Sequence, residues 1–201
     1  MEQLLTLHEQ IGGTDKGRRD LEVLNKSAVV LLTACWEAYI EDLCKEAFLY
    51  MLYNCESYTQ ISVGIREEVG AKLISGDVWS IAGDGWRKVI EEHVKEAFIN
   101  EIDEKFHTPR SYNVKLLLKK YLGIGDITRA WYWQKMSTSQ AVKKLNDMIT
   151  IRGGIAHRVK DPNLDINIQK QHVIRYMKHI ETLVEKTESA VQIHVKQTLK
   201  K

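Results

Sequence analysis

The chain has 201 residues, of which 44% are hydrophobic and 28% charged, a balance that is typical of globular proteins and excludes a disordered chain. This length suits one domain with a sizeable core, since domains cluster near roughly 100 to 200 residues. The formal net charge of +2 excludes a surface that is basic throughout, so any contact with nucleic acid must be local.

The first predicted element is a long amphipathic helix over residues 20–55, which follows an N-terminal extension of residues 1–19. Its apolar residues recur at steps of three and four, the period of one helix face. They are Leu21, Leu24, Ala28, Leu31, Cys35, Tyr39, Leu43, Ala47 and Met51.

The three cysteines, Cys35, Cys44 and Cys55, form no CxxC pair and have no histidine at metal-ligand spacing, so we expect buried thiols in a reducing cytoplasm. The N-terminus has neither a basic n-region nor a long apolar h-region. The longest nearly apolar run, residues 28–36, is far below the roughly 20 residues that cross a bilayer. We therefore expect a cytoplasmic protein without a membrane span.

Three shorter helices are expected next, over residues 62–74, 86–106 and 113–122. Gly123 directly follows the third and is suited to be its C-cap. Glycines separate these segments, and the chain has only two prolines, which favours helices over its length.

A helix over residues 139–158 follows Ser137, Thr138 and Ser139, residue types that cap helix N-termini. A second long helix is predicted from about residue 168, ending in a basic helical tail over residues 186–201. Neither strand alternation nor a repeat is visible. The sequence therefore predicts a single all-α domain over residues 1–201, an antiparallel helical bundle with two long helices and shorter inserted ones.

The helix over residues 139–158 contains an arginine where its apolar stripe should continue. Arg152 falls in line with the apolar residues of this helix, and a buried guanidinium costs several kcal/mol unless it is paired or lines a wet cleft. Gly153 and Gly154 follow, and each costs about 1 kcal/mol against alanine inside a helix. The glycines indicate either a close approach of another backbone or a loosened helix.

The spacing of Arg152 and His157, an arginine and a histidine separated by four residues, resembles the signature of HEPN-domain proteins. Residues 32–43, with the sequence LTACWEAYIEDL, resemble the first long helix of the RiboL-PSP type of HEPN domain. The stretch from Thr108-Pro109 to Trp131 is similar to the central region of that type. The resemblance covers residues 20–185, and it implies a HEPN helical domain.

The resemblance also implies an endoribonuclease that needs no metal and no cofactor, and that acts as a homodimer with one composite cleft. RNA carries its own nucleophile, the 2′-OH, so cleavage leaves 2′,3′-cyclic phosphate and 5′-OH ends. His157 would move protons, because the pKa of histidine lies near 6.5. Arg152 would hold the phosphate with its planar fork. A toxin–antitoxin, phage-defence or stress-response setting is implied, with an antitoxin or other partner protein as a candidate regulator.

Other residues have weaker claims to a role in this chemistry. Glu37 lies between Trp36 and Tyr39 and could orient Arg152 or His157, or it could be a solvated residue. The basic residues that could guide the RNA backbone, or simply solvate a face, are Arg110, Lys115, Lys119, Lys120 and Arg158.

Two other functions remain open at this stage. One is a non-catalytic HEPN-like module that binds RNA or a nucleotide, in keeping with Gly153 where the family commonly has a polar residue. The other is a helical adaptor that docks a partner protein through an amphipathic face.

Overall fold

A computed structural model describes residues 18–74, 76–103, 106, 108–157 and 167–200. The described part contains the α-helices α2 (Arg18–Asn54), α3 (Val63–Ile74), α4 (Gly85–Ala97), α5 (Ser111–Leu122), α6 (Thr138–His157) and α7 (Lys170–Leu199). A π-helical segment, Phe98–Asp103, extends α4, and short 3-10 turns lie at Tyr58–Gln60, Val78–Ile81 and Ile127–Ala130. No strand occurs among the described residues, so the predicted all-α class is confirmed.

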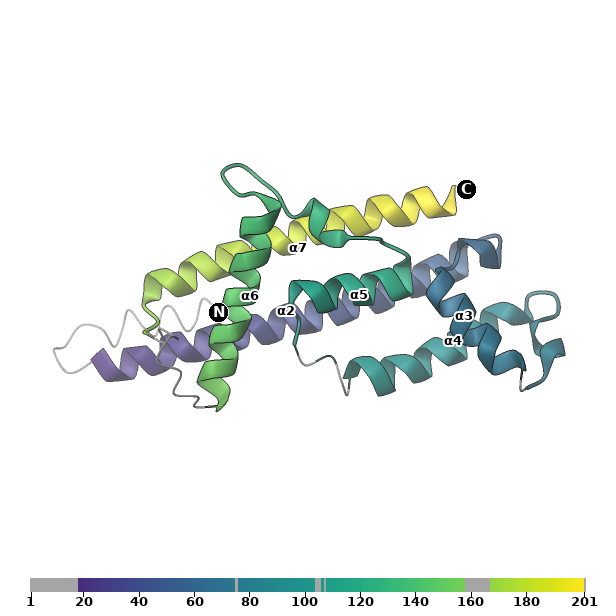
Figure 1. The fold of residues 1–201 in the computed structure, drawn as a ribbon, viewed down its shortest axis with the longest axis horizontal. Helices are drawn as coiled ribbons and strands as arrows, with labels where there is room; N and C mark the ends of the chain where they lie inside the picture. The colour runs from purple at the N-terminus through teal and green to yellow at the C-terminus, as the bar shows by residue number, and fades with distance from the viewer. Residues whose placement is uncertain (1–17, 75, 104–105, 107, 158–166, 201) are drawn as a thin grey trace.

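The two long helices, α2 and α7, lie side by side along the length of the molecule and point in the same direction (Figure 1). The amide of Asn25 donates to the carbonyl of Ile168 at 2.8 Å, and the hydroxyl of Tyr39 donates to that of Val184 at 3.1 Å. From the first contact to the second, the residue number increases on both helices. The long helices are parallel rather than antiparallel, because α3 to α6 return the chain to its starting end before α7 begins.

Most of the deepest residues of α2 lie beside the predicted apolar stripe, although Ala28 and Met51 on that stripe are buried as well. Trp36, Ile40 and Cys44 are fully buried, whereas Leu31 is 43% exposed and Cys35 is exposed. The prediction of a buried thiol is wrong for Cys35 and confirmed for the other two cysteines. The reason is that α2 has two apolar faces, since its half-buried residues, including Tyr39, lie against α7.

By length and composition alone, α2 is also the one helix in the described ranges that could cross a membrane, over residues 21–54. In this fold it is the central helix, with contacts to α4, α5, α6 and α7. Its apolar character is therefore used in the core of the domain.

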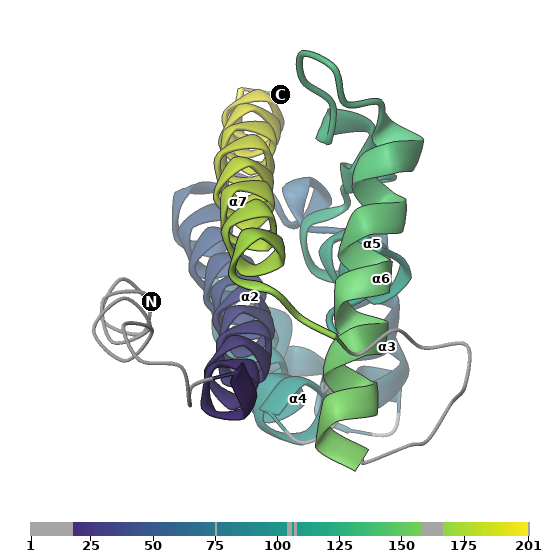
Figure 2. The ribbon, with the colours of Figure 1, turned by 90° about the vertical axis from the view of Figure 1, so that its left-hand side faces the viewer.

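Helix α6 crosses α2 and stands beside it when the molecule is viewed along its length (Figure 2). Its start is fixed by a reciprocal cap: the backbone N–H of Gln140 donates to Ser137 Oγ at 3.3 Å, and the N–H of Ser137 donates to Gln140 Oε1 at 2.9 Å. The predicted serine cap is thereby confirmed. The predicted C-cap of α5 is confirmed as well, because Gly123 has a left-handed φ of 75°.

Helix α7 continues without a break to Leu199 and buries Val191 and Val195. The segment expected as a basic tail, residues 186–201, therefore contributes to the core over most of its length. At the other end of the chain, nearly all of the predicted extension, residues 1–17, lies outside the described residues.

Candidate functional site

Arg152 occupies the position on α6 where the core-facing stripe reaches the edge of the core. Met148 and Ile149 are buried one turn earlier on the same face, and Arg152 itself is half-buried. Within the described residues, its guanidinium has neither a hydrogen-bond partner nor an ion-pair partner. A half-buried cation is tolerated where it is paired or reaches water, so this position is suited to an anion.

His157 is the last residue of α6, five residues after Arg152. On an α-helix this spacing corresponds to a rise of about 7.5 Å and a turn of roughly 140°. The two residues thus lie on one rigid element at its C-terminal end. The side chain of His157 and the whole of Arg158 lie outside the described residues.

The first glycine of the pair between these residues has space around it, whereas Gly154 is buried. A Cβ added to Gly153 would meet no atom within 4 Å, so no close backbone approach requires a glycine there. The sequence allowed two interpretations of the glycine pair, and the close approach of another backbone is wrong for Gly153. The other interpretation, a locally loosened helix, remains for Gly153, since glycine is less favourable than alanine inside a helix.

A polar cluster joins the start of α5 to α6 near the same end. Arg110 donates to Thr150 Oγ1 at 2.8 Å and to the carbonyl of Asn146 at 3.4 Å. The Asn146 side chain accepts from the backbone N–H of Ser111 and donates to its hydroxyl, both at 3.0 Å. Arg110 is half-buried, and within the described part of the chain it contacts neutral oxygens, so it brings a second cation to this region.

This second cation was not singled out from the sequence beyond a general role in guiding RNA. The sequence did contain a signal for a role of Arg110, because this arginine stands in the stretch Thr108 to Ser111 that leads into α5. What the sequence could not supply was the crossing of α6 over α5, which brings Thr150 within reach of Arg110.

Helix α2 fixes the position of this cluster from the other side. The buried indole of Trp36 donates to the carbonyl of Pro109 at 3.0 Å, and its ring lies edge-on to that of Trp131 with centroids 6.0 Å apart. Glu37 follows Trp36 on α2 and is half-buried. Its role in orienting Arg152 or His157 stays a prediction.

The lysines proposed to guide RNA lie on α5, and two of them have acidic partners. Lys115 Nζ lies 2.7 Å from Asp126 Oδ2, and Lys120 Nζ lies 2.9 Å from Glu68 Oε1. Lys119 is exposed. Because ion pairs neutralise two of these charges, α5 offers less positive charge than its sequence indicates, and the role of its lysines stays a prediction.

Comparison with known proteins gives one informative match. The sequence profile of a family described as RiboL-PSP-HEPN matches residues 1–192. No curated protein and no solved structure gives a significant match. The matched range contains Arg152, Gly153, His157 and the cluster around Arg110.

Proposed function

Because this chain belongs to the RiboL-PSP-HEPN family, which indicates an RNase-like or RNA-binding function, we propose that it is an endoribonuclease that cleaves RNA without a metal ion. The observation that carries this proposal is the half-buried guanidinium of Arg152, which has no partner among the described residues and stands five residues before His157 on α6. In this proposal an RNA phosphate is the anion that Arg152 binds.

In the proposed reaction the 2′-oxygen attacks the adjacent phosphorus, so that a new O–P bond forms and the bond to the 5′-oxygen breaks. A base takes the proton of the 2′-OH, and an acid gives a proton to the leaving 5′-oxygen. Arg152 would stabilise the negative charge on the phosphorane, and donors aimed at such charge are typically worth roughly 10² to 10³ in rate. His157 would be the proton carrier, since the ordinary pKa of histidine lies near 6.5.

One histidine cannot be base and acid in the same step, which supports a homodimer with two Arg152–His157 pairs in one cleft. Arg110 is a candidate for a second phosphate ligand, because it is held beside Thr150 through neutral contacts. A toxin, defence or stress-response setting, with a partner protein that controls the activity, remains part of the proposal on the strength of the family resemblance.

The test is cleavage of end-labelled RNA in EDTA by the wild type, His157→Ala and Arg152→Ala, with Arg129→Ala as the matched control. Arg129 is an exposed arginine on the 3-10 turn Ile127–Ala130, which follows α5 and is not part of α6. We expect cleavage by the wild type and the control, with 2′,3′-cyclic phosphate ends, and a loss of at least about 10²-fold in both site variants.

Equal cleavage by all four proteins would refute the proposed roles of the two residues. RNA binding without any cleavage would favour the non-catalytic module. No interaction with RNA, together with a large loss of stability in Arg152→Ala, would favour the adaptor.

A further inference from the structure

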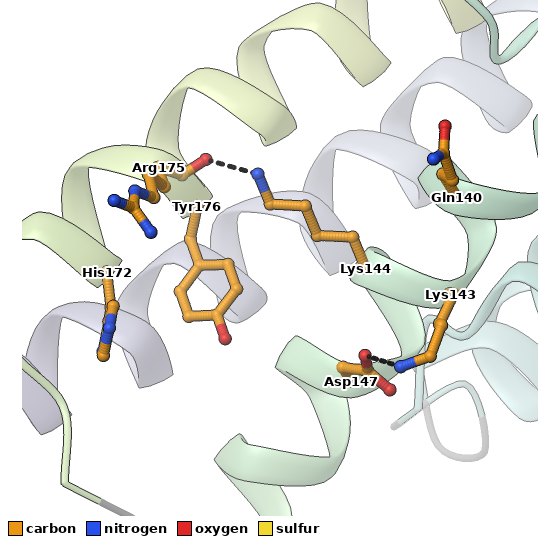
Figure 3. A pocket seen from close by; sticks show the side chains of 7 residues that line it. All are labelled: Gln140, Lys143, Lys144, Asp147, His172, Arg175 and Tyr176. Carbon is orange, nitrogen blue, oxygen red and sulfur yellow. Dashed lines mark hydrogen bonds and ion pairs between the residues drawn. The ribbon is translucent and has the colours of Figure 1, made fainter. Parts of the chain in front are cut away.

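A cavity of about 290 Å³ lies between the first half of α6 and the first two turns of α7 (Figure 3). We refer to it as the α6–α7 pocket. The residues that define it here are Lys143, Lys144 and Asp147 from α6, with His172, Arg175 and Tyr176 from α7.

The pocket carries more positive than negative charge. Lys143 is neutralised locally by Asp147, whose Oδ2 lies 2.6 Å from its Nζ. Lys144 Nζ donates to the backbone carbonyl of Arg175 at 3.2 Å, a neutral acceptor, and within the described part of the chain the Arg175 guanidinium has no acidic partner. Burial, and then the nearby charge of Arg175, lower the pKa of Lys144. Lys144 and Arg175 therefore both line this pocket, and among the described residues neither of them has an acidic partner.

The two walls of the pocket are fixed by a buried histidine. His179 is 3% exposed, and its Nε2 lies 3.1 Å from the carbonyl of Ala141 on α6. On α7 it follows Arg175 by one turn and so continues the face that lines the pocket. Because this contact joins α6 to α7, the spacing between Lys144 and Arg175 is set before any ligand arrives.

We propose that the α6–α7 pocket binds a phosphate group of the RNA backbone, which rests on the proposed function. A guanidinium holds two phosphate oxygens at once, and an ammonium adds a point charge beside it. The start of α7 contributes the positive end of its dipole. The pocket shares α6 with Arg152, which lies eight residues, or about 12 Å along the helix, after Lys144. A strand bound at Arg152 therefore has its neighbouring phosphates within reach of the pocket.

The test is the binding of a fluorescein-labelled, fully 2′-O-methylated RNA of twelve nucleotides in EDTA, followed by anisotropy at several salt concentrations. This RNA has no free 2′-OH, so binding is measured without cleavage. The pocket variant is Lys144→Gln/Arg175→Gln, and the matched control, Lys178→Gln/Lys196→Gln, removes two exposed charges from α7. The single variant Arg175→Gln keeps the Lys144 contact to the backbone and guards against a folding defect in the double variant.

We expect the pocket variant to weaken binding by at least tenfold and to reduce the salt slope by roughly 1.4, about 0.7 for each lost contact to a single strand. Arg175→Gln should give about half of that reduction, and the control should change the affinity less than threefold. Equal effects in the pocket variant and the control, or no effect in either, would overturn the proposal.

Two further measurements separate this proposal from other failures. Cleavage of unmodified RNA by the wild type tests the nuclease on its own, so an inactive protein that still loses binding in the pocket variant refutes only the nuclease. Melting in inorganic phosphate tests the source of the anion. If phosphate stabilises the wild type but not the pocket variant, while both bind RNA equally, the assignment to RNA is overturned in favour of a small anion.

Discussion

The replacement Arg152→Met separates the proposed role of this arginine from a structural one. Methionine keeps the apolar stem but removes the guanidinium, which is half-buried and without a partner among the described residues. Breaking a buried ion pair by removing one partner typically costs about 3 to 5 kcal/mol. At Arg152 no such pair is lost in the described structure, and a partly desolvated charge is removed. We therefore expect the free energy of unfolding to change by less than about 1 kcal/mol, with stabilisation as the favoured sign.

Arg110→Met is the matched comparison, because the two arginines have similar exposure but different partners. Its loss removes the contacts to Thr150 Oγ1 at 2.8 Å and to the carbonyl of Asn146 at 3.4 Å. Hydrogen bonds to charged groups are worth about 1.5 to 3 kcal/mol, so we expect a loss in that range for Arg110→Met.

Thermal melts and urea titrations of the two variants measure this difference. For a chain of this size 1 kcal/mol shifts Tm by about 2 to 4 °C, so Arg152→Met should melt within roughly 4 °C of the wild type, and Arg110→Met clearly below it. The same Arg152→Met protein should lose at least about 10²-fold in cleavage rate. A loss of more than about 2 kcal/mol in Arg152→Met would show that the guanidinium is held by a partner, and the reasoning from its missing anion would be refuted.

Three more predictions concern a thiol, two glycines, namely Gly153 inside one helix and Gly123 at the end of another, and a buried histidine. Cys35 should react with a thiol reagent within minutes in the folded protein, because it is exposed. Cys44 and Cys55 should react only after unfolding, because they are buried and burial also raises the pKa of the Cys44 thiol. Titration with a chromogenic disulfide should count one fast thiol. Gly153→Ala should stabilise the protein by about 0.5 to 1 kcal/mol, since the added Cβ meets open space within a helix. Gly123→Ala should destabilise it by a similar amount, because the φ of Gly123 is 75°. Urea titrations in which both variants change the free energy of unfolding with the same sign would contradict this. Burial, and then Lys144, lower the pKa of His179 to about 4, below the ordinary value of 6.5, so the unfolded chain takes up a proton first as the pH falls. The stability that this histidine contributes is complete above pH 6.5 and is lost between 6.5 and 4, by roughly 2 to 3 kcal/mol, and His179→Gln should flatten a stability-against-pH curve in that window.

The helices were predictable because each carries its own local signals. The Ser137–Gln140 cap marks the start of α6, and Gly123 marks the end of α5. The direction of the long helices was not predictable in this way. It depends on how four intervening helices return the chain, and no single segment encodes that path.

The offset of the apolar stripe on α2 has a similar cause. Cys35 fits the apolar period as well as Trp36 does, and only the positions of α5, α6 and α7 decide which of them is covered. Periodicity identifies a helix with more than one apolar face, but it does not rank the faces when several neighbours compete for them.

The candidate site shows the same division between local and long-range information. The spacing of Arg152 and His157 is a property of one helix, so the sequence predicts it and α6 contains it. Arg110 donates to Thr150 of α6 across 40 residues of the chain, and Lys144 of α6 donates to the backbone carbonyl of Arg175 across 31. Such contacts arise from the crossing of α6 over its neighbours, and the sequence does not specify that crossing.

This crossing also divides α6 into two halves with different supports. Its first half is held by α7 through the contact of His179 with Ala141, and its second half by α5 through the contact of Arg110 with Thr150. Lys144 and Arg152 are eight residues apart within this supported span, so their separation is fixed by a straight helix. The glycine pair begins directly after Arg152, and beyond Gly153 the helix stays in contact with the core, since Gly154 is buried and Ile155 packs against the core. The packing of this last turn therefore sets where α6 ends, and the helix itself fixes the rise between Arg152 and His157.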